Sequence, residues 1–276
     1  MEKTVSIIIT CYNKAPYIAD SIESALSQTY ANVEVIVIDD GSKDGSAAII
    51  EQFLSRGVKF IQQENKGVCI ARNNAIRQST GEFIVPLDAD DILAPNYVQK
   101  CIEWFCTDPS TKLVYTLGEF FGLRTGPIEI PPYNWDSLLW YSIIPATSMY
   151  RRTDFDRTKG YNPNMQFALE DWDFYLSLLN PTDIVHLIEE PLLRYRIVKN
   201  ARNTCINPNK EAIFKQIYDN HRDLYSQHNN MLLLANDNWK EYEHLYQEIR
   251  ESKAYRLGKA LLRPYTQLRS CLSHLH

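Results

Sequence analysis

Three carboxylates stand close together directly after an apolar run in the first half of the chain. Residues 83–87 read Phe-Ile-Val-Pro-Leu, and Asp88, Asp90 and Asp91 follow within four positions. Such a run is typical of a buried strand in an α/β sheet, and ligands of these sheets bind beyond the carboxyl ends of the strands. Carboxylates this close repel each other, so a divalent cation with oxygen ligands would stabilise them, and such a cation binds phosphates. The alternative is that Asp90 or Asp91 only caps the helix after Pro95.

Two earlier strand ends carry side chains that could bind a nucleotide. Thr10 and Tyr12 follow the first β-branched run, and Asp39 and Asp40 follow the second apolar run. An aromatic ring can stack on a nucleobase, and a carboxylate can accept a hydrogen bond from a base N–H. The alternatives are that Tyr12 is a packing residue and that Asp40 caps the next helix. No glycine-rich phosphate loop follows the first strand, which disfavours a dinucleotide-binding domain.

Strands and helices alternate through the first ninety residues. This pattern predicts an α/β fold with a mostly parallel sheet flanked by helices and joined by right-handed crossovers. The strands are predicted at residues 5–10, 33–38, 58–61 and 83–88. The helices between them are predicted to begin at Pro16, before Ala47 and at Gly67, and the second of them is expected to turn Ala47, Ile50 and Leu54 inward.

The pattern becomes less regular after residue 95. The elements predicted there are a helix with Val98, Cys101, Ile102 and Phe105 inward, one or two strands in 113–121, a loop-rich segment 122–145 with an aromatic helix at 135–141, a strand at 146–150, a helix at 170–179, strands at 184–187 and 192–197, and helices at 209–229 and 231–252. We therefore expect one α/β domain over residues 1–206 and a helical extension over residues 207–276.

Composition and charge limit the class of partner. The net charge of −5 gives no general case for nucleic-acid binding, but residues 253–276 carry five Lys or Arg and no acid. This amphipathic tail predicts contact with a membrane surface or formation of a homodimer, and both interpretations remain open. The six cysteines form no CxxC pair, no secretory signal precedes the first strand, and no window of 18 apolar residues occurs. We therefore expect a cytoplasmic protein, with the inner face of the plasma membrane as the surface that the tail would bind.

Six segments together resemble the family 2 glycosyltransferases of the GT-A fold. They are, in the order of that family, residues 5–13 (VSIIITCYN), 24–30 (SALSQTY), 37–45 (VIDDGSKDG), 65–73 (NKGVCIARN), 81–90 (GEFIVPLDAD) and 169–173 (LEDWD). The likeness covers about residues 3 to 200. It implies an inverting, metal-dependent hexosyltransferase that uses a UDP-sugar, of the type that assembles bacterial surface polysaccharides.

The resemblance implies roles for particular residues on the donor side. Thr10, Tyr12 and Asp40 would hold the uracil, with Asp39 close by, and Arg72 would lie near the nucleotide and its phosphates. Asp88-Ala89-Asp90 would be the DxD motif of the family. Asp90 would then be the direct ligand of Mn²⁺ or Mg²⁺, and Asp88 would lie nearer the ribose or the donor sugar.

The acceptor side is implied by the second acidic segment. Asp171 of the pair Glu170-Asp171 would be the general base that takes the proton of the acceptor hydroxyl, and Trp172 would help to line the acceptor site. The alternative is that Asp171 only caps its helix or is an exposed charge in its first turn, where the helix dipole favours a carboxylate. The acceptor is expected to be a saccharide or a lipid-linked saccharide.

One segment departs from the family pattern. Many relatives carry a histidine near the end of the segment that corresponds to residues 193–200, where this chain has Val198 and Lys199. Arg196, Lys199 or Arg202 would neutralise the diphosphate instead, unless these are solvated surface cations.

Two other functions remain open from the sequence. A metal-dependent nucleotidyltransferase also uses aspartates beside a parallel sheet, although the loop at residues 11–14 lacks its basic character. A catalytically idle nucleotide-sugar-binding scaffold is the alternative that is not an enzyme. The nature of the sugar, the acceptor and the linkage has no legible signal in the sequence.

Overall fold

The computed structural model describes residues 3–199 and 206–226. The described residues divide into two compact units, one that ends at Asn220 and one that begins at His221 and contains helix α9 (Arg222–Ser226). The predicted helix at 231–252 and the basic tail at 253–276 lie outside the described residues. The predicted domain boundary after residue 206 stays a prediction.

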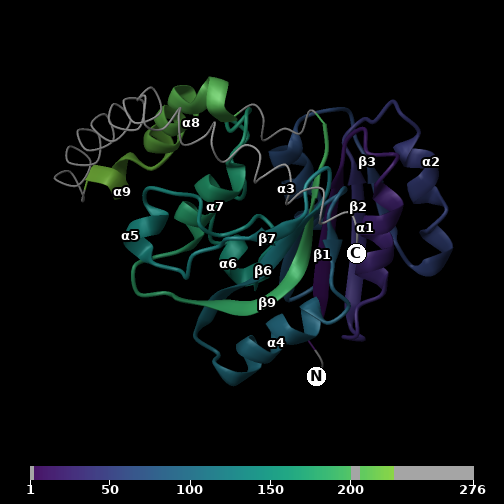
Figure 1. The fold of residues 1–276 in the computed structure, drawn as a ribbon, viewed down its shortest axis with the longest axis horizontal. Coiled ribbons are helices and arrows are strands. Elements are labelled where there is room, and N and C mark those ends of the chain that lie inside the picture. The colour runs from purple at the N-terminus through teal and green to yellow at the C-terminus, as the bar shows by residue number, and fades with distance from the viewer. Residues whose placement is uncertain (1–2, 200–205, 227–276) are drawn as a thin grey trace, which may run out of the picture. The chain divides into compact units, whose positions relative to one another are not determined.

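The first part of the sheet is built from the predicted βα repeats (Figure 1). Its elements are β1 (Val5–Cys11), α1 (Ile18–Leu26), β2 (Val33–Asp39), α2 (Ser46–Glu51), β3 (Lys59–Gln62), α3 (Val68–Gln78) and β4 (Phe83–Asp88). These four strands are parallel in the order β3-β2-β1-β4. The register pairs Cys11 with Asp39 and Thr10 with Asp88, so the motif-bearing strand ends lie side by side at one edge.

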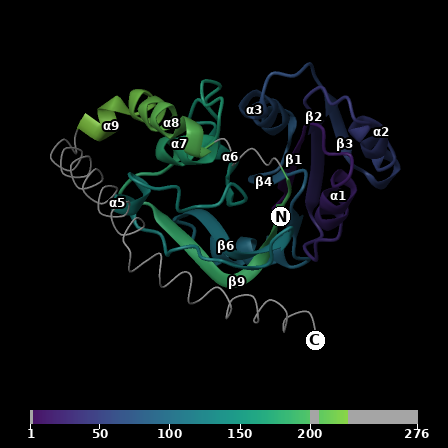
Figure 2. The ribbon, with the colours of Figure 1, turned by 45° about the horizontal axis from the view of Figure 1, so that its top comes forward.

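The interior strand β1 is buried on both of its faces. Ile7, Ile8 and Ile9 have no exposed surface, although neighbouring residues of a strand point to opposite sides. Both faces are covered because α1 and α3 pack against β1, and Figure 2 shows these helices on different sides of the strand. This explains why β1 is a continuous β-branched run rather than an alternating one.

The second part of the sheet is mixed. Its elements are β5 (Ile92–Leu93), α4 (Tyr97–Thr107), β6 (Thr111–Gly122), β7 (Gly126–Ile128), α5 (Trp135–Leu138), β8 (Met149–Arg151), α6 (Arg152–Phe155), α7 (Glu170–Leu178), β9 (Ile184–Ile197) and α8 (Ile206–Asn220). The sheet continues β4-β8-β6-β9-β5, with β7 paired to β6. The β6–β9 pair is parallel, whereas β8, β5 and β7 pair antiparallel. The predicted α/β class is confirmed, and the parallel character is concentrated in the first part.

Three local predictions need correction. The strands predicted at 184–187 and 192–197 are one strand, β9, which follows β6 through register shifts that absorb the irregular middle. The helix predicted at 209–229 is divided, because α8 ends at Asn220 and α9 begins at Arg222. Leu54 was expected to face inward, but it is 48% exposed because α2 ends at Glu51 and a 3₁₀ turn follows. The predicted inward face of α4 is confirmed, since all four of its residues are buried.

Candidate active site

The end of β1 turns into a loop that is held by the loop after β2. The Asn13 carboxamide oxygen accepts a hydrogen bond from the Lys43 backbone N–H at 2.8 Å, and Asn13 N–H donates to Ser42 Oγ at 2.8 Å. Asn13 has a φ of 53°, a left-handed conformation that asparagine tolerates better than most residues. Tyr12 is 46% exposed, so its ring is open to solvent rather than buried as a packing residue.

Asp39 and Asp40 are both buried, but they contact different loops. Asp39 accepts hydrogen bonds from Ser42, which closes the turn after β2. Asp40 accepts from Gln63 Nε2 at 2.7 Å and from the backbone N–H groups of Lys66 and Gly67 at 2.9 and 2.8 Å. Asp40 therefore fixes the loop that leads into α3 and does not cap α2.

Gly41 lets those two loops approach each other. It has a φ of +78°, and a Cβ atom there would lie 2.9 Å from the backbone nitrogen of Asn65. Any L-residue at this position would be strained and would also collide with the backbone of the loop before α3. The glycine that follows the two aspartates is thus required for Asp40 to reach its partners.

The carboxylates of the loop after β4 differ in exposure and in partner. The side chain of Asp88 is 34% exposed and that of Asp90 is 14% exposed, whereas Asp91 is only 3% exposed. Asp90 forms an ion pair with Lys14, and the Asp91 carboxylate accepts a hydrogen bond from the Arg196 backbone N–H at 2.9 Å. Burial and the neighbouring aspartates raise the pKa of Asp90 and raise that of Asp91 well above its usual range.

Arg72 connects this loop to the second acidic segment. Its side chain is 1% exposed and donates to Asp88 Oδ1 at 3.0 Å and to Glu170 Oε1 at 3.4 Å. The guanidinium also lies over the ring of Tyr161, 4.7 Å from its centroid. Burial lowers the pKa of Arg72, but the nearby Tyr161, Asp88 and Glu170 outweigh burial and raise it well above its ordinary value. The guanidinium is therefore a permanently charged link between β4 and α7.

The acidic pair opens helix α7 from a strained backbone position. Leu169, which precedes the helix, has φ 62° and ψ 28°, a left-handed conformation that is rare for leucine. Glu170 and Asp173 are 1% and 2% exposed, and Asp173 Oδ1 accepts a hydrogen bond from Asn220 Nδ2 at 2.6 Å. Asp171 is half-buried between them, and its Oδ1 accepts from the Trp172 backbone N–H at 2.8 Å.

Trp172 was expected to line the acceptor site, but its ring is in the core. It is 2% exposed, and its indole N–H donates to the Leu138 carbonyl at 2.6 Å. The ring of Phe214 on α8 meets it edge to face, with centroids 5.3 Å apart. The buried Trp172 ring thus packs α7 against α5 and α8, and it has almost no accessible surface with which to contact a ligand.

The two predicted cations of β9 and its end have different surroundings. Arg196 Nε donates to the Asp90 carbonyl and an Arg196 Nη donates to Asp20, at 2.9 and 2.8 Å. The rings of Tyr17 and Phe121 flank its guanidinium, with centroids 4.8 and 4.2 Å away. Arg196 thus supports the Asp90 backbone. Lys199 is exposed, and Arg202 lies outside the described residues.

The carboxylate pair Asp88 and Asp90 fits one kind of metal site. Within residues 3–199 and 206–226, no group of three or more His, Cys, Asp or Glu side chains could hold a metal ion alone. Mg²⁺ is commonly held by one or two carboxylates together with substrate phosphates and water. Two mutually repelling carboxylates at the edge of the sheet fit a cation that binds together with a diphosphate.

Two residues of the site have no signal in the sequence pattern. Lys14 belongs to the loop at residues 11–14, and it pairs with Asp90 from 76 positions away. Tyr161 lies under Arg72, and its position there follows from hydrogen bonds between its backbone and the Asn73 side chain. Neither contact has a local signal, because both join segments that are distant in the sequence.

The arrangement of strands and helices is shared with solved glycosyltransferases. S. aureus TarS in complex with UDP has a TM-score of 0.60 and 20% identity, covering 79% of this chain and 71% of that one. A mannosyltransferase from Pyrobaculum calidifontis, in complex with GDP-Man and Mn²⁺, has a TM-score of 0.58 and 17% identity, covering 94% and 84%. The fold is therefore that of the GT-A glycosyltransferases.

The sequence comparison is more specific. The sequence model for "Glycosyl transferase family 2" matches residues 6–159, and the chain belongs to this family. A chondroitin synthase of Escherichia coli is 34% identical over 77% of this chain and 32% of its own length. A hyaluronan synthase of Pasteurella multocida is 29% identical over 92% of this chain and 26% of its own. The chain thus spans about a quarter to a third of these relatives. In its described part, no helix has the length and apolarity needed to cross a bilayer.

Proposed function

We propose that this glycosyltransferase moves a sugar from a UDP-sugar to a hydroxyl of a saccharide acceptor, with inversion at the anomeric carbon and with a bound Mn²⁺ or Mg²⁺. The observation that carries the proposal is the Arg72 link. One buried guanidinium contacts both Asp88 of the DxD segment and Glu170 of the acidic pair. The expected donor side and the expected base therefore lie within reach of one substrate.

The nucleotide would bind at the ends of β1 and β2. The exposed ring of Tyr12 offers a surface on which uracil can stack, with Thr10 beside it on the strand. A carboxylate has about four lone-pair sites, and three of those on Asp40 accept bonds from Gln63, Lys66 and Gly67. The remaining site, on Oδ2, would accept the N–H of the base, in an orientation that the three other bonds fix.

The diphosphate would lie over the loop after β4. Asp90 would hold the divalent cation, with Asp88 beside it nearer the ribose or the donor sugar, and the cation when bound neutralises the charge that develops on the leaving diphosphate. Arg196 holds the Asp90 carbonyl and so keeps this loop in place. Lys199, exposed just beyond the end of β9, is the cation that would approach the phosphates directly.

The acceptor hydroxyl would lose its proton to Asp171. A hydroxyl is a poor nucleophile, and a positioned carboxylate that takes its proton accelerates the attack. Glu170 is held by Arg72 and Asp173 by Asn220, so the first turn of α7 is fixed on both sides of Asp171. The start of a helix also favours a negatively charged side chain. A single base opposite the leaving group supports one displacement with inversion.

The acceptor and the setting belong to the same proposal. We infer a saccharide, free or lipid-linked, in the synthesis of a bacterial surface polysaccharide, because the relatives include enzymes named chondroitin and hyaluronan synthases. The catalytic domain would span residues 1–206. The basic tail would contact the inner face of the plasma membrane or a second copy of the chain.

A donor screen tests the proposal. UDP release would be measured from UDP-glucose, UDP-galactose, their N-acetyl forms and UDP-glucuronate, with Mn²⁺, with Mg²⁺ and with EDTA. Chondroitin and hyaluronan oligosaccharides and a lipid-linked saccharide would serve as acceptors, and NMR of the product would give the anomeric configuration. We expect turnover of one or two UDP-sugars, lost in EDTA, with a β-linked product from an α-linked donor.

Contrary results have separate meanings. Turnover of GDP-mannose but of no UDP-sugar would overturn the donor assignment. Undiminished turnover in EDTA would overturn the metal assignment. Binding of UDP-sugars without transfer to any acceptor would favour the scaffold function.

A further inference from the structure

A polar pocket lies at the end of the sheet opposite the candidate active site. It has a volume of about 390 Å³ and lies where β6 and β9 begin and β8 ends. Arg151 in its wall pairs with Phe83 at the start of β4, whereas Asp88 ends that strand. Five residues of strand at about 3.3 Å each put the two regions roughly 17 Å apart. The pocket is therefore distinct from the donor site.

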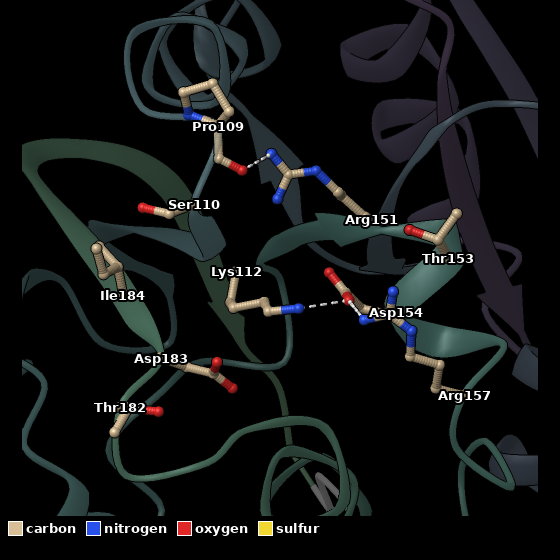
Figure 3. A pocket seen from close by; sticks show the side chains of 10 residues that line it. All are labelled: Pro109, Ser110, Lys112, Arg151, Thr153, Asp154, Arg157, Thr182, Asp183 and Ile184. Atoms are coloured by element: carbon tan, nitrogen blue, oxygen red, sulfur yellow. Dashed lines mark hydrogen bonds and ion pairs between the residues drawn. The ribbon is translucent and has the colours of Figure 1, made fainter.

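The charged groups of the pocket are held in place by one another. Asp154 Oδ1 accepts from Lys112 Nζ at 2.7 Å and from Arg157 at 2.9 Å, as Figure 3 shows. Arg151 donates to the backbone carbonyls of Pro109 and Thr111. Lys112 and Arg157 keep further N–H donors, and Arg157 is 72% exposed. Fixed donors of this kind bind a ligand without first losing rotamer freedom.

The two carboxylates of the pocket differ in what they can do for a ligand with hydroxyl groups. Asp154 is 5% exposed, and its Oδ2 is itself buried and meets no hydrogen-bond donor within the described chain, so Asp154 serves to hold Lys112 and Arg157 in place. Asp183 stands across the pocket, with one oxygen bonded to the Asn180 backbone. The three cations Lys112, Arg151 and Arg157 face the two carboxylates Asp154 and Asp183, so the net positive charge of the pocket is only about one unit and favours a phosphate weakly. A ligand that both donates and accepts hydrogen bonds fits it better.

An aromatic surface continues the pocket along β9. Trp104 on α4 is 38% exposed and stacks on His186, with ring centroids 4.1 Å apart and an interplanar angle of 21°. His186 lies two positions after Ile184 of the pocket wall, so both side chains point to the same face of the strand. Hydrogen bonds from Ser110 lower the pKa of Asp108, and the nearby His186 and Arg151 lower it further. Asp108 connects the stacked pair to the pocket in the chain itself, since its backbone N–H donates to the Trp104 carbonyl at 2.9 Å and the next residue, Pro109, lines the pocket.

We propose that this pocket and Trp104 bind a saccharide chain. The C–H face of a sugar ring would pack on the exposed indole, and hydroxyls of a neighbouring sugar would bond to Arg157, Lys112 and Asp183. The proposal rests on the proposed function for the source of the chain, which would be the acceptor at a point several sugars away from the transfer site. A long acceptor would contact the protein at both sites, and binding at one site raises the effective concentration of the chain at the other. Its affinity should therefore exceed that of a short acceptor.

Binding is tested first, on the full chain and without donor. Long and short chondroitin and hyaluronan oligosaccharides would be titrated while tryptophan fluorescence and saturation-transfer NMR are recorded. We expect Trp104→Ala and Arg157→Ala each to weaken binding of the long oligosaccharides by roughly three- to tenfold. Trp104→Phe retains a ring and should retain most of the affinity. Leu54→Ala truncates an exposed apolar side chain outside the pocket. It is the matched control, and the affinity for the oligosaccharides should not change.

Transfer is tested second. The KM for long acceptors should rise in Trp104→Ala by a similar factor, while kcat, the KM for short acceptors and donor hydrolysis stay unchanged. Equal KM values for long and short acceptors, or wild-type binding by both variants, would overturn this inference and leave the proposed function intact. Oligosaccharide binding that depends on Trp104 in a protein without transfer activity would overturn only the proposed function. Binding of inorganic phosphate in place of saccharide would overturn the ligand class.

Discussion

Two groups of acids meet at Arg72, one after a strand and one at the start of a helix. The strand-end group, Asp88, Asp90 and Asp91, brings three carboxylates together at the end of β4, and burial together with the repulsion between them raises the pKa of Asp90 and Asp91. In the helix-start group, Glu170 and Asp173 are buried against Arg72 and Asn220. Asp171 lies between them, half-buried.

The difference between the two groups shows how the position of an acidic residue, in a loop or on a helix, determines what it can do. Concentrated charge in a loop favours a cation, because a cation relieves the repulsion. On a helix, successive side chains are turned by about 100°, so two acids can anchor the turn while the one between them faces elsewhere. The first arrangement is suited to binding charge and the second to moving a proton.

The largest expected effect comes from Asp171→Asn. If Asp171 is the base, kcat should fall by about 10²–10⁴-fold, the usual contribution of general base catalysis. The amide still accepts the Trp172 N–H, so folding and donor affinity should not change. Steady-state kinetics and calorimetry with UDP check both statements.

Asp173→Asn is the matched control, two positions along the same helix. Its oxygen can still accept from Asn220, so kcat should stay within a fewfold of the wild type. Equal losses of kcat in both variants would remove the distinction between anchor and base.

Arg72→Met tests the link between the two groups. It leaves Asp88 and Glu170 without their buried partner, and removing one member of a buried ion pair costs about 3–5 kcal/mol of unfolding free energy. Urea unfolding measures this loss. Arg77→Met, on the exposed side of the same helix, should cost less than about 0.5 kcal/mol.

A double variant separates charge from packing. Arg72→Met combined with Glu170→Gln should recover part of the lost stability, since one uncompensated charge is gone. If the loss of unfolding free energy in the double variant equals the sum of the losses in the two single variants, Arg72 is not an electrostatic link.

Asp90→Asn sharpens the assignment of the metal. Loss of one carboxylate ligand should raise the Mn²⁺ concentration needed for half-maximal activity and lower kcat about a hundredfold, an effect of several kcal/mol on the transition state. Titration of activity and of UDP affinity with Mn²⁺ measures the change. Asp171→Asn should leave the Mn²⁺ concentration for half-maximal activity unaltered. A change of equal size in that variant would mean that metal binding is not confined to the strand-end group.

The positions of the strand ends could be predicted from the sequence because each of them is marked locally. Thr10, Asp39 and Asp88 each lie at the end of an apolar run in a βα repeat, and parallel strands align their carboxyl ends without further information. The partners of these residues could not be predicted in this way. Lys14 and Arg196 reach Asp90 from 76 and 106 positions away, and these contacts depend on the finished fold.

For the helix-start group, the sequence indicates the motif but not the environment of its residues. The segment 169–173 was recognisable as a motif, but its surroundings were not. Trp172 looked like a surface for the acceptor and is buried, because α8 and the α5 segment cover it. The second part of the sheet joins strands by antiparallel pairs and register shifts, which the hydrophobic pattern of a single strand does not encode. Leucine also gives no sign that residue 169 adopts a left-handed conformation.

Leu169 provides the smallest and most local test of the comparison. A left-handed conformation costs a leucine about 1–2 kcal/mol, so Leu169→Gly should relieve strain while it adds about 0.5–1 kcal/mol of backbone entropy cost and loses some packing. The net change in unfolding free energy should be below about 1 kcal/mol. Leu123→Gly, which relieves no such strain at a 73% exposed leucine, is the matched control and should only destabilise.

The kcat of the Leu169 variants tests whether the left-handed conformation of this residue contributes to catalysis. If the strained residue sets the direction of Asp171, Leu169→Gly should lower kcat severalfold at an unchanged KM for the donor, because a freer backbone holds the base less firmly. Leu169→Asn suits the left-handed region and should keep most of the activity. A wild-type kcat in the glycine variant would mean that the anchors Glu170 and Asp173 fix Asp171 by themselves. The strain would then have no part in catalysis, and the contrast with the strand-end group would rest on side-chain contacts alone.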